Sequence, residues 1–374
     1  MNEAIYRPGL EGIIAGETAI STIAGGLRYR GYAIEDLALH ASFEEVAYLI
    51  LYGELPTSGE FEAFCGRLRQ AMVLPSPLEA ILREIPATAG PMDVLRSGAS
   101  LLAHFDPQTG EASHEADLAK AERLLAQLPV VLGAFHRQRQ GHEPVAADAD
   151  LSLAGNILWL LNGEKPSARF VRTMDVTLIL YAEHEYNAST FTARVVASTL
   201  SDMHSAVTAA IGALKGPLHG GANERVMEVL QEVGAPERAE SWVRDALARK
   251  VRIMGFGHRV YKTGDPRARF LKDLSRELAE ETGNLALEET ADVIEDVVVK
   301  EKGLPPNLDW PSARVYHYLG LPIDLYTPLF VLSRVVGWAA HVIEQHDNNR
   351  LIRPRAKYTG PDLRSWVPID ERTA

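Results

Sequence analysis

The feature that most constrains the fold of this chain is the dominance of helical patterns over strand patterns. Ser42 to Tyr52 starts with a capping serine and continues with apolar residues at helical spacing. Asp175 to Leu214 is rich in Ala, Leu, Val and Thr, with short polar interruptions. Thr327-Pro328 precedes an apolar run to Glu344, which predicts a helix start with a capping hydroxyl. Only Gly16 to Tyr32 could hold a short hairpin, so we expect a mainly α-helical protein.

Composition and charge exclude several classes of protein. Of the 374 residues, 46% are hydrophobic and 24% are charged, which excludes wholesale disorder. The longest uncharged run is the 13 residues from Leu151 to Gly163, shorter than the roughly 20 of a membrane span, and no signal peptide is evident. We therefore expect a cytoplasmic protein with no membrane partner. Cys65 is the only cysteine, which excludes a disulfide framework and a multi-thiolate metal site. The net charge of −12 argues against a nucleic-acid partner.

Two breaks in the helical pattern suggest a division into domains. The first is Lys215-Gly216-Pro217 and the second is Gly320-Leu321-Pro322, just before the predicted Thr327 helix. We expect a large helical domain from residues 1–215 and 325–374, and a smaller helical domain from residues 216–324. The smaller domain contains most of the candidate chemistry.

Basic residues are concentrated in one part of this acidic chain. The 33 residues from Arg244 to Arg276 hold ten basic and three acidic side chains, a local charge of +7. Such a cluster is often only a solvated helix face. Here it surrounds Gly255-Phe256-Gly257-His258, a glycine-flanked loop whose backbone amides can approach a ligand closely. We therefore expect a small polyanion, such as a phosphorylated cofactor, rather than a long nucleic acid.

Three other residues are candidates for chemistry, each with a simpler alternative. His219 is followed by two glycines that give access to its imidazole, although a histidine at an ordinary helix start would look the same. Asp309 lies between Leu308 and Trp310, which can desolvate its carboxylate and raise its basicity, although it could be a capping aspartate. His184 does not begin an HExxH motif, because residue 188 is alanine, so the zinc-protease interpretation fails.

Taken together, these segments resemble one family. In chain order the segments are GLEGIIAGETAIS, LRYRGYAIEDLA, LKGPLHGGAN, MGFGHRVYKTGDPRAR, NLDW, SRVVGWAAHVIEQ and IRPRAKY. From about Gly9 to Pro361 the chain closely resembles citrate synthase, in the short, dimeric form without an added N-terminal domain. The resemblance implies an all-α fold with a mobile small domain. It also implies an acyltransferase of the citrate (Si)-synthase type, which converts acyl into alkyl on transfer and serves the tricarboxylic acid cycle.

The resemblance also implies a role for each candidate residue. Family members condense acetyl-CoA with oxaloacetate and hydrolyse citryl-CoA, with no metal and no cofactor besides the substrates. By the motif match, Asp309 is the base, His219 supports the thioester oxygen and His258 polarises the ketone. The implied oxaloacetate-binding residues are His184, Arg267, Arg334 and Arg353, the last donated across the interface of a homodimer. The implied CoA-binding residues are Arg259, Lys262, Gly255 and Gly257.

Three alternatives remain open at this point. 2-Methylcitrate synthase uses propionyl-CoA with the same residues, and one methylene is worth only about 1–3 kcal/mol of discrimination. A non-catalytic helical binding module is the second alternative. The third is a metal-dependent hydrolase that would use His184, His219, His258 and Asp309.

Overall fold

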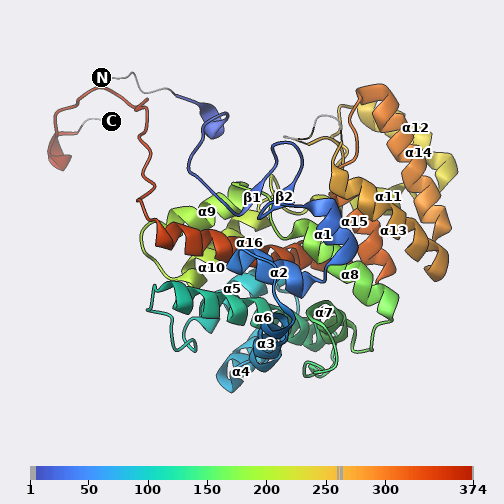
Figure 1. Cartoon of the computed structure of the whole chain (residues 1–374). Helices are drawn as coiled ribbons and strands as arrows, with labels where there is room; N and C mark the ends of the chain where they lie inside the picture. Colours follow the sequence, from blue (N-terminus) through green and yellow to red (C-terminus); the bar gives the residue numbers. More distant parts are fainter. Residues whose placement is uncertain (1–5, 259–260, 262–263, 373–374) are drawn as a thin grey trace.

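The chain folds mainly into helices, as predicted, in a computed structural model that describes residues 6–258, 261 and 264–372 (Figure 1). The α-helices of the described residues are α1 (Ile34–His40), α2 (Phe43–Tyr52), α3 (Ser58–Ala71), α4 (Ser76–Glu84), α5 (Pro91–Leu102), α6 (His114–Arg139), α7 (Leu153–Asn162), α8 (Ala168–Tyr181), α9 (Ala188–Ala197), α10 (Met203–Lys215), α11 (Ala222–Val233), α12 (Pro236–Ala248), α13 (Pro266–Thr282), α14 (Leu285–Lys302), α15 (Asp309–Tyr318) and α16 (Tyr326–Asp347). Short 3-10 turns are η1 (Pro8–Leu10), η2 (Ile323–Leu325) and η3 (Ile369–Glu371), and the strands are β1 (Ser21–Thr22), β2 (Arg28–Tyr29) and β3 (Tyr32–Ala33).

Helix α16 forms the centre of the fold. Helices α2, α5, α6, α8, α9 and α10 contact it, and its Trp338 is fully buried (Figure 1). Of the described residues, Ile323–Asp347 alone form a helix long and apolar enough to cross a membrane by length and composition, but nearly all of it is buried inside the protein. An apolar helix in the middle of a helical protein satisfies the same test.

The predicted helix starts are right in one case and wrong in another. Ser42 and Glu45 form a capping box at the start of α2, as the sequence predicts. At α16 the expected cap at Thr327 is wrong, because η2 leads directly into the helix at Tyr326. The Thr327 hydroxyl instead donates a hydrogen bond to Glu224 on α11.

The apolar stretch from Asp175 to Leu214 is divided among the end of α8 and the helices α9 and α10. The turn between α8 and α9 carries His184. The hairpin predicted within Gly16 to Tyr32 is present as β1 and β2, and β3 adds a third antiparallel strand. The Tyr29 hydroxyl lies 3.0 Å from the carbonyl oxygen of Glu183, so this small sheet packs on the turn that carries His184.

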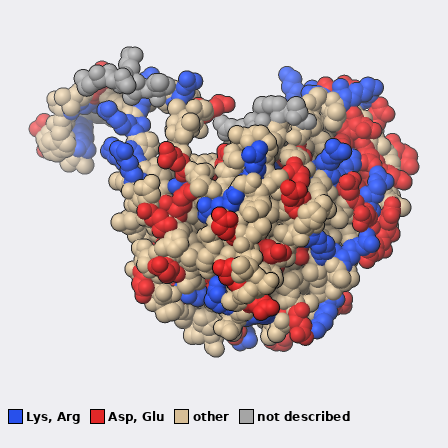
Figure 2. Space-filling model, in the orientation of Figure 1, with Lys and Arg blue, Asp and Glu red and all other residues tan. Residues whose placement is uncertain are grey.

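Helices α11 to α15 pack mainly against one another at one end of the molecule (Figure 1). Helix α10 ends at Lys215, where the Gly216-Pro217 pair predicts an end. Whether residues 216–324 move as a domain stays a prediction. After α16 ends at Asp347, the chain continues as an extended C-terminal segment that projects from the body (Figures 1 and 2).

Candidate active site

Hydrogen bonds between two loops hold the segment of Asp309 beside the loop of His258. The backbone N–H of Asn307 donates to the Gly255 carbonyl at 2.9 Å, and its side-chain amide donates to the Gly257 carbonyl at 2.9 Å. The Phe256 ring packs on Trp310 with 4.5 Å between ring centroids. Residues 255–258 and 305–310 therefore form one hydrogen-bonded unit, which we call the tethered loops.

Gly255 is required by the geometry of the tethered loops. Its φ is +88°, and a Cβ atom at this position would lie 2.9 Å from the Trp310 ring. Gly255 is buried and does not line the neighbouring cavity, whereas Gly257 does. Of the two glycines expected to approach a CoA, the structure therefore brings only Gly257 to a cavity wall.

Asp309 has the environment of a base. It occupies the first turn of α15, and its Oδ1 accepts a hydrogen bond of 2.7 Å from the Tyr181 hydroxyl. Burial raises the pKa of the carboxyl, while the Tyr181 hydrogen bond and the charge of Arg267 act in the opposite direction. The effect of burial has the direction that the sequence predicts for this carboxylate.

The hydrogen bonds of His219 determine which of its nitrogens carries the proton. The backbone N–H of Ser189 donates to Nε2 at 3.2 Å. Because a backbone N–H can only donate, Nε2 is an acceptor, and we assign the proton of the neutral ring to Nδ1. Burial, with a smaller contribution from the charge of Arg334, lowers the pKa of His219 to about 4. The ring is therefore a neutral hydrogen-bond donor through Nδ1 at physiological pH.

The same argument gives the opposite tautomer for His258. The backbone N–H of Tyr261 donates to its Nδ1 at 3.2 Å, so we assign the proton of the neutral ring to Nε2. The ring of His184 lies 5.3 Å from that of His258, centroid to centroid. Burial, together with the charges of Arg267 and Arg334, holds the pKa of His184 well below its usual value. Its Nε2 is buried and has no hydrogen-bond partner among the described residues.

The two expected arginines of the body of the protein have different environments. Arg267 is held by Asp265 through two hydrogen bonds, of 3.0 Å from Nε and 2.9 Å from Nη2. Asp265 therefore neutralises this guanidinium within the same chain. Arg334 is 2% exposed, its Nε donates to the Tyr181 carbonyl at 2.6 Å, and it makes no ion pair within the described part of the chain. Burial lowers its pKa to about 10. The charge of Glu183 acts on Arg334 from beyond ion-pair distance, and burial of a guanidinium without a direct ion pair is costly.

The ring of Phe330 brings these groups together. Its centroid lies 4.6 Å from that of Tyr181 and 6.3 Å from that of His219, and the Arg334 guanidinium carbon lies 4.8 Å from it. Tyr181 in turn contacts Asp309. The neutral donor and the buried cation therefore border one ring, and the base candidate is joined to that ring through Tyr181.

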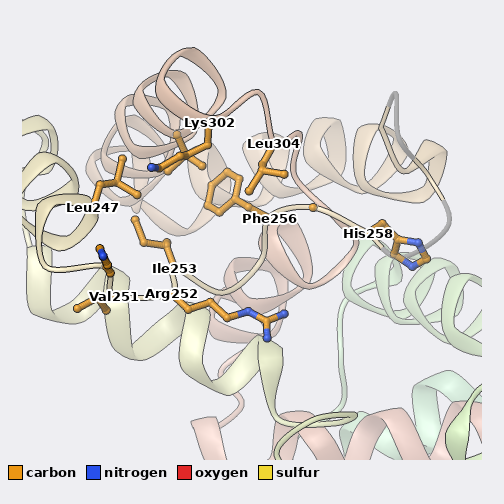
Figure 3. A pocket seen from close by; sticks show the side chains of 11 residues that line it. Leu247, Val251, Arg252, Ile253, Phe256, His258, Lys302 and Leu304 are labelled. Carbon is orange, nitrogen blue, oxygen red and sulfur yellow. The ribbon is translucent and has the colours of Figure 1, made fainter. Parts of the chain in front are cut away.

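A cavity of about 550 Å³ adjoins the tethered loops (Figure 3). Its wall comes from the end of α12, the following loop and the end of α14 (Figure 3). The lining residues are Leu247, Lys250, Val251, Arg252, Ile253, Phe256, Gly257, His258, Val298, Lys302 and Leu304. Lys250, Arg252 and Lys302 make no ion pair within the described residues, so the cavity combines three uncompensated cations with apolar walls.

Acidic neighbours neutralise many of the other basic side chains between Arg244 and Arg276, as expected if these side chains only form a solvated helix face. Acidic and basic side chains are intermixed over the face drawn in Figure 2. The paired cations of the window are Arg244, Arg249, Arg267, Lys272 and Arg276. Arg259 and Lys262, the cations expected to bind CoA phosphates, lie outside the described residues.

Arg353 is not brought to the site of its own chain. It is exposed, follows the end of α16, and lines a separate cavity of about 980 Å³ together with Arg194 and Glu344. The described residues also include no group of three His, Cys, Asp or Glu side chains placed to hold a metal. The geometry therefore gives no support to a metal site built from His184, His219, His258 and Asp309.

Several residues of the site were missed from the sequence. Tyr181 was part of an apolar helical stretch, and Lys302 lies far along the chain from the basic window. Asp265 lies within the MGFGHRVYKTGDPRAR segment and Ser189 follows His184 by five residues, but the sequence does not predict their contacts with Arg267 and His219. For Ser189 and Asp265, the only indication in the sequence is that each is a polar residue close to a candidate site residue.

Comparisons with known proteins agree with this geometry. The family described as "Citrate synthase, C-terminal domain" matches residues 9–355. Citrate synthase 2 of Bacillus subtilis is 50% identical over 97% of this chain and 98% of its own. A 2-methylcitrate synthase of Shewanella oneidensis is 48% identical over 97% of each chain. A citrate synthase structure from Thermoplasma acidophilum, a ternary complex with carboxymethyl coenzyme A and oxaloacetate, superposes with a TM-score of 0.92 at 37% identity, covering 98% of this chain and 99% of that one.

The fold, the histidines and carboxylate of the site, and the similarity over nearly the whole length agree. The chain belongs to the citrate synthase family and is an enzyme of the citrate synthase type, a transferase.

Proposed function

We propose that this enzyme condenses acetyl-CoA with oxaloacetate and hydrolyses the resulting citryl-CoA to citrate and CoA. One observation carries the proposal. The carboxylate of Asp309, whose pKa is raised by burial, accepts a hydrogen bond from Tyr181, and the ring of Tyr181 packs on Phe330. The neutral donor His219 and the buried cation Arg334 border the same Phe330 ring. Deprotonation of a thioester methyl next to a bound dianion needs these three kinds of group.

In the proposed reaction Asp309 takes a proton from the acetyl methyl group. The electron pair moves to the thioester oxygen, where the Nδ1–H of His219 donates a hydrogen bond to the developing enolate. The methyl carbon then attacks the ketone carbon of oxaloacetate, and the electron pair of the C=O π bond moves to the ketone oxygen. This oxygen takes the Nε2 proton of His258 and becomes the hydroxyl of citryl-CoA, and solvent returns a proton to His258. Water finally hydrolyses the thioester and releases CoA. Positioned acid–base groups contribute roughly 10²–10⁴-fold each.

Oxaloacetate carries two carboxylates that require cations and hydrogen-bond donors. Arg334 offers a buried guanidinium that makes no ion pair within the described residues, and Nε2 of His184 offers a buried group without a hydrogen-bond partner among them. Arg267, held rigidly by Asp265, supplies a second guanidinium. Arg353 is a further ligand donated by the partner subunit of a homodimer, which agrees with its exposed position outside the site of its own chain.

The cavity in Figure 3 is the site for the nucleotide end of CoA. Lys250, Arg252 and Lys302 provide charge for the phosphates, and Ile253 and Phe256 provide apolar surface for the adenine. Gly257 allows close approach of the backbone. Arg259 and Lys262 remain candidates for phosphate contacts.

Residues 216–324 form a mobile domain that closes when oxaloacetate binds. The intermediate must be shielded from water before hydrolysis, and helices α11 to α15 pack mainly against one another. Acetyl-CoA is therefore expected to bind more tightly after oxaloacetate, with compaction visible in solution scattering. The enzyme acts in the cytoplasm, with no metal or redox cofactor, and full activity is expected after exhaustive chelation.

A 2-methylcitrate synthase is the second candidate, because a relative with that name is 48% identical to this chain. Parallel measurement of kcat/KM for acetyl-CoA and propionyl-CoA with oxaloacetate decides between them. We expect a higher value for acetyl-CoA. A higher value for propionyl-CoA would favour the second candidate, and failure to release CoA from either thioester would refute both.

A further inference from the structure

The hydroxyl of Tyr181 connects α8 to the catalytic end of α15. Tyr181 is 3% exposed, and its oxygen lies 2.7 Å from Oδ1 of Asp309 and 2.8 Å from Oγ of Ser312. Ser312 is fully buried, one helical turn after Asp309 on α15. Two side chains with no assigned role therefore lie behind the carboxylate that we propose as the base.

The number of protons fixes the direction of these hydrogen bonds. An ionised carboxylate can only accept, so the single phenolic proton of Tyr181 is donated to Asp309. The Ser312 hydroxyl lies 2.8 Å from the Tyr181 oxygen and 3.3 Å from the Asp309 carbonyl oxygen, and we assign its proton to the shorter contact, with the Tyr181 oxygen as acceptor. The result is a chain from Ser312 through Tyr181 to Asp309, in which each hydrogen bond polarises the next.

This chain distinguishes the two oxygens of Asp309. Oδ1 is occupied by Tyr181, whereas Oδ2 makes no hydrogen bond within the described residues. The proton taken from a substrate therefore goes to Oδ2, and the carboxyl group does not need to rotate. A phenol also binds a carboxylate more strongly than a neutral carboxylic acid, so the contact favours the form that acts as a base.

The placement of Tyr181 does not depend on its hydroxyl. Its ring packs on Phe330, and its backbone carbonyl accepts the Nε–H of Arg334. A phenylalanine keeps both contacts and removes only the bond to Asp309. The variant Tyr181→Phe therefore separates the hydroxyl from the packing.

Other charged and titratable groups also act on this pair, and all of them remain in the variant. Arg267 and Asp265, at the start of α13, act on Asp309, the first lowering its pKa and the second raising it. Tyr316 on α15 acts on Tyr181. Arg334 on α16 contacts the Tyr181 backbone. A difference between the wild type and Tyr181→Phe is therefore due to the lost hydroxyl.

We propose that Tyr181 is a positioning residue that, supported by Ser312, fixes the Asp309 carboxylate and keeps it in its basic form. This inference rests on the proposed role of Asp309 as the base. It assigns the two hydroxyls to the deprotonation step and not to substrate binding. Their loss is expected to lower kcat and to leave the KM for oxaloacetate unchanged.

The test is the pH dependence of kcat/KM for acetyl-CoA at saturating oxaloacetate. In Tyr181→Phe we expect the acidic limb to move to higher pH by about one unit, with kcat about tenfold lower at neutral pH. Ser312→Ala should move the limb in the same direction by less. Tyr326→Phe is the matched control, because Tyr326 is fully buried and its hydroxyl has no hydrogen-bond partner among the described residues. Its limb should not move.

Three outcomes would overturn the inference. One is an equal loss of activity at every pH in Tyr181→Phe, which would indicate packing alone. Another is a limb that shifts as much in Tyr326→Phe. The third outcome is needed if Tyr181→Phe does not fold. In that case, an acidic limb that does not move in Ser312→Ala would overturn the inference. The variant Asp309→Asn separates this inference from the proposed function. Substantial turnover in Asp309→Asn would refute the assignment of Asp309 as the base. If Asp309→Asn is inactive and the acidic limb does not move in Tyr181→Phe, only the inference is refuted.

Discussion

Removal of the Arg252 guanidinium should lower kcat/KM for acetyl-CoA, because the enzyme loses a contact with the nucleotide end of that substrate and with no other part of it. Arg252 lines the cavity of Figure 3 and has no acidic partner within the described residues. Arg249, three residues earlier in the same basic window, is exposed and pairs with Asp245 at 2.8 Å. Arg252→Ala and Arg249→Ala therefore remove the same charge from the same segment, one in the cavity wall and one outside it.

The structure sets the size of the effect. Arg252 is exposed and lines the cavity, so its attraction to a phosphate is close to the solvent-screened limit of about 1 kcal/mol at 4 Å. A charge-assisted hydrogen bond raises this to about 2 kcal/mol. At about 1.4 kcal/mol per factor of ten, kcat/KM for acetyl-CoA should fall about 5- to 30-fold in Arg252→Ala. The loss should appear in KM, because the contact is the same in the ground state and the transition state.

The assay compares acetyl-CoA with acetyl-pantetheine, which has the same reacting thioester but no nucleotide. With acetyl-pantetheine, the wild type and Arg252→Ala should have equal kcat/KM values. Arg249→Ala should match the wild type with both substrates. The difference for acetyl-CoA should also shrink at about 1 M salt, where the screening length is about 3 Å. An Arg252→Ala defect that is equally large with acetyl-pantetheine would refute the assignment of the cavity to the nucleotide.

Three further predictions concern the base, a buried carboxyl group and the subunit interface. Asp309→Asn should remain folded and bind oxaloacetate but lose at least about 10²-fold in condensation, measured as CoA release, and near-normal turnover would contradict the assignment. Burial and the neighbouring Glu44 raise the pKa of Asp175 to about 7. The folded state therefore keeps a proton that the unfolded state loses near pH 4. As a result, the free energy of unfolding of the wild type falls as pH rises from about 4 to 7. Asp175→Asn should therefore become more stable relative to the wild type between pH 5 and pH 8 in urea unfolding, and a constant difference would contradict this. Mixing Asp309→Asn with Arg353→Ala subunits should restore activity if Arg353 acts across the interface, and no recovery in heterodimers confirmed by native mass spectrometry would defeat the shared site.

The mainly α-helical fold class could be predicted from the sequence because the signals that start and continue a helix lie within a few neighbouring residues. The capping box of Ser42 and Glu45 satisfies the first turn of α2 with residues three positions apart, so it is readable without any tertiary structure. Thr327 carries an equally good local signal, but its hydroxyl bonds to Glu224, about a hundred residues away. The Thr327 hydroxyl, which the local pattern assigns to the helix cap, is therefore bound by Glu224, a residue distant in the sequence.

The site shows the same division between local and distant information. His219, His258 and Asp309 are marked by glycines or by bulky neighbours next to them in the sequence. Tyr181 has no such mark, because its contact with Asp309 joins positions 128 residues apart. Lys302 similarly reaches the cavity only because α14 ends beside the loop after α12. Contacts of this kind require the packed structure.

The tethered loops have a consequence for how the chemistry can be timed. His258 and Asp309 belong to one hydrogen-bonded unit within residues 216–324, which also include His219, whereas Arg334 lies on α16. In the proposed closure, a rigid displacement of residues 216–324 leaves the spacing of His219, His258 and Asp309 unchanged and alters their distance from Arg334. Alignment of these three groups with Arg334 then depends on a single relative movement, and a solvent of higher viscosity would slow that movement without changing either domain.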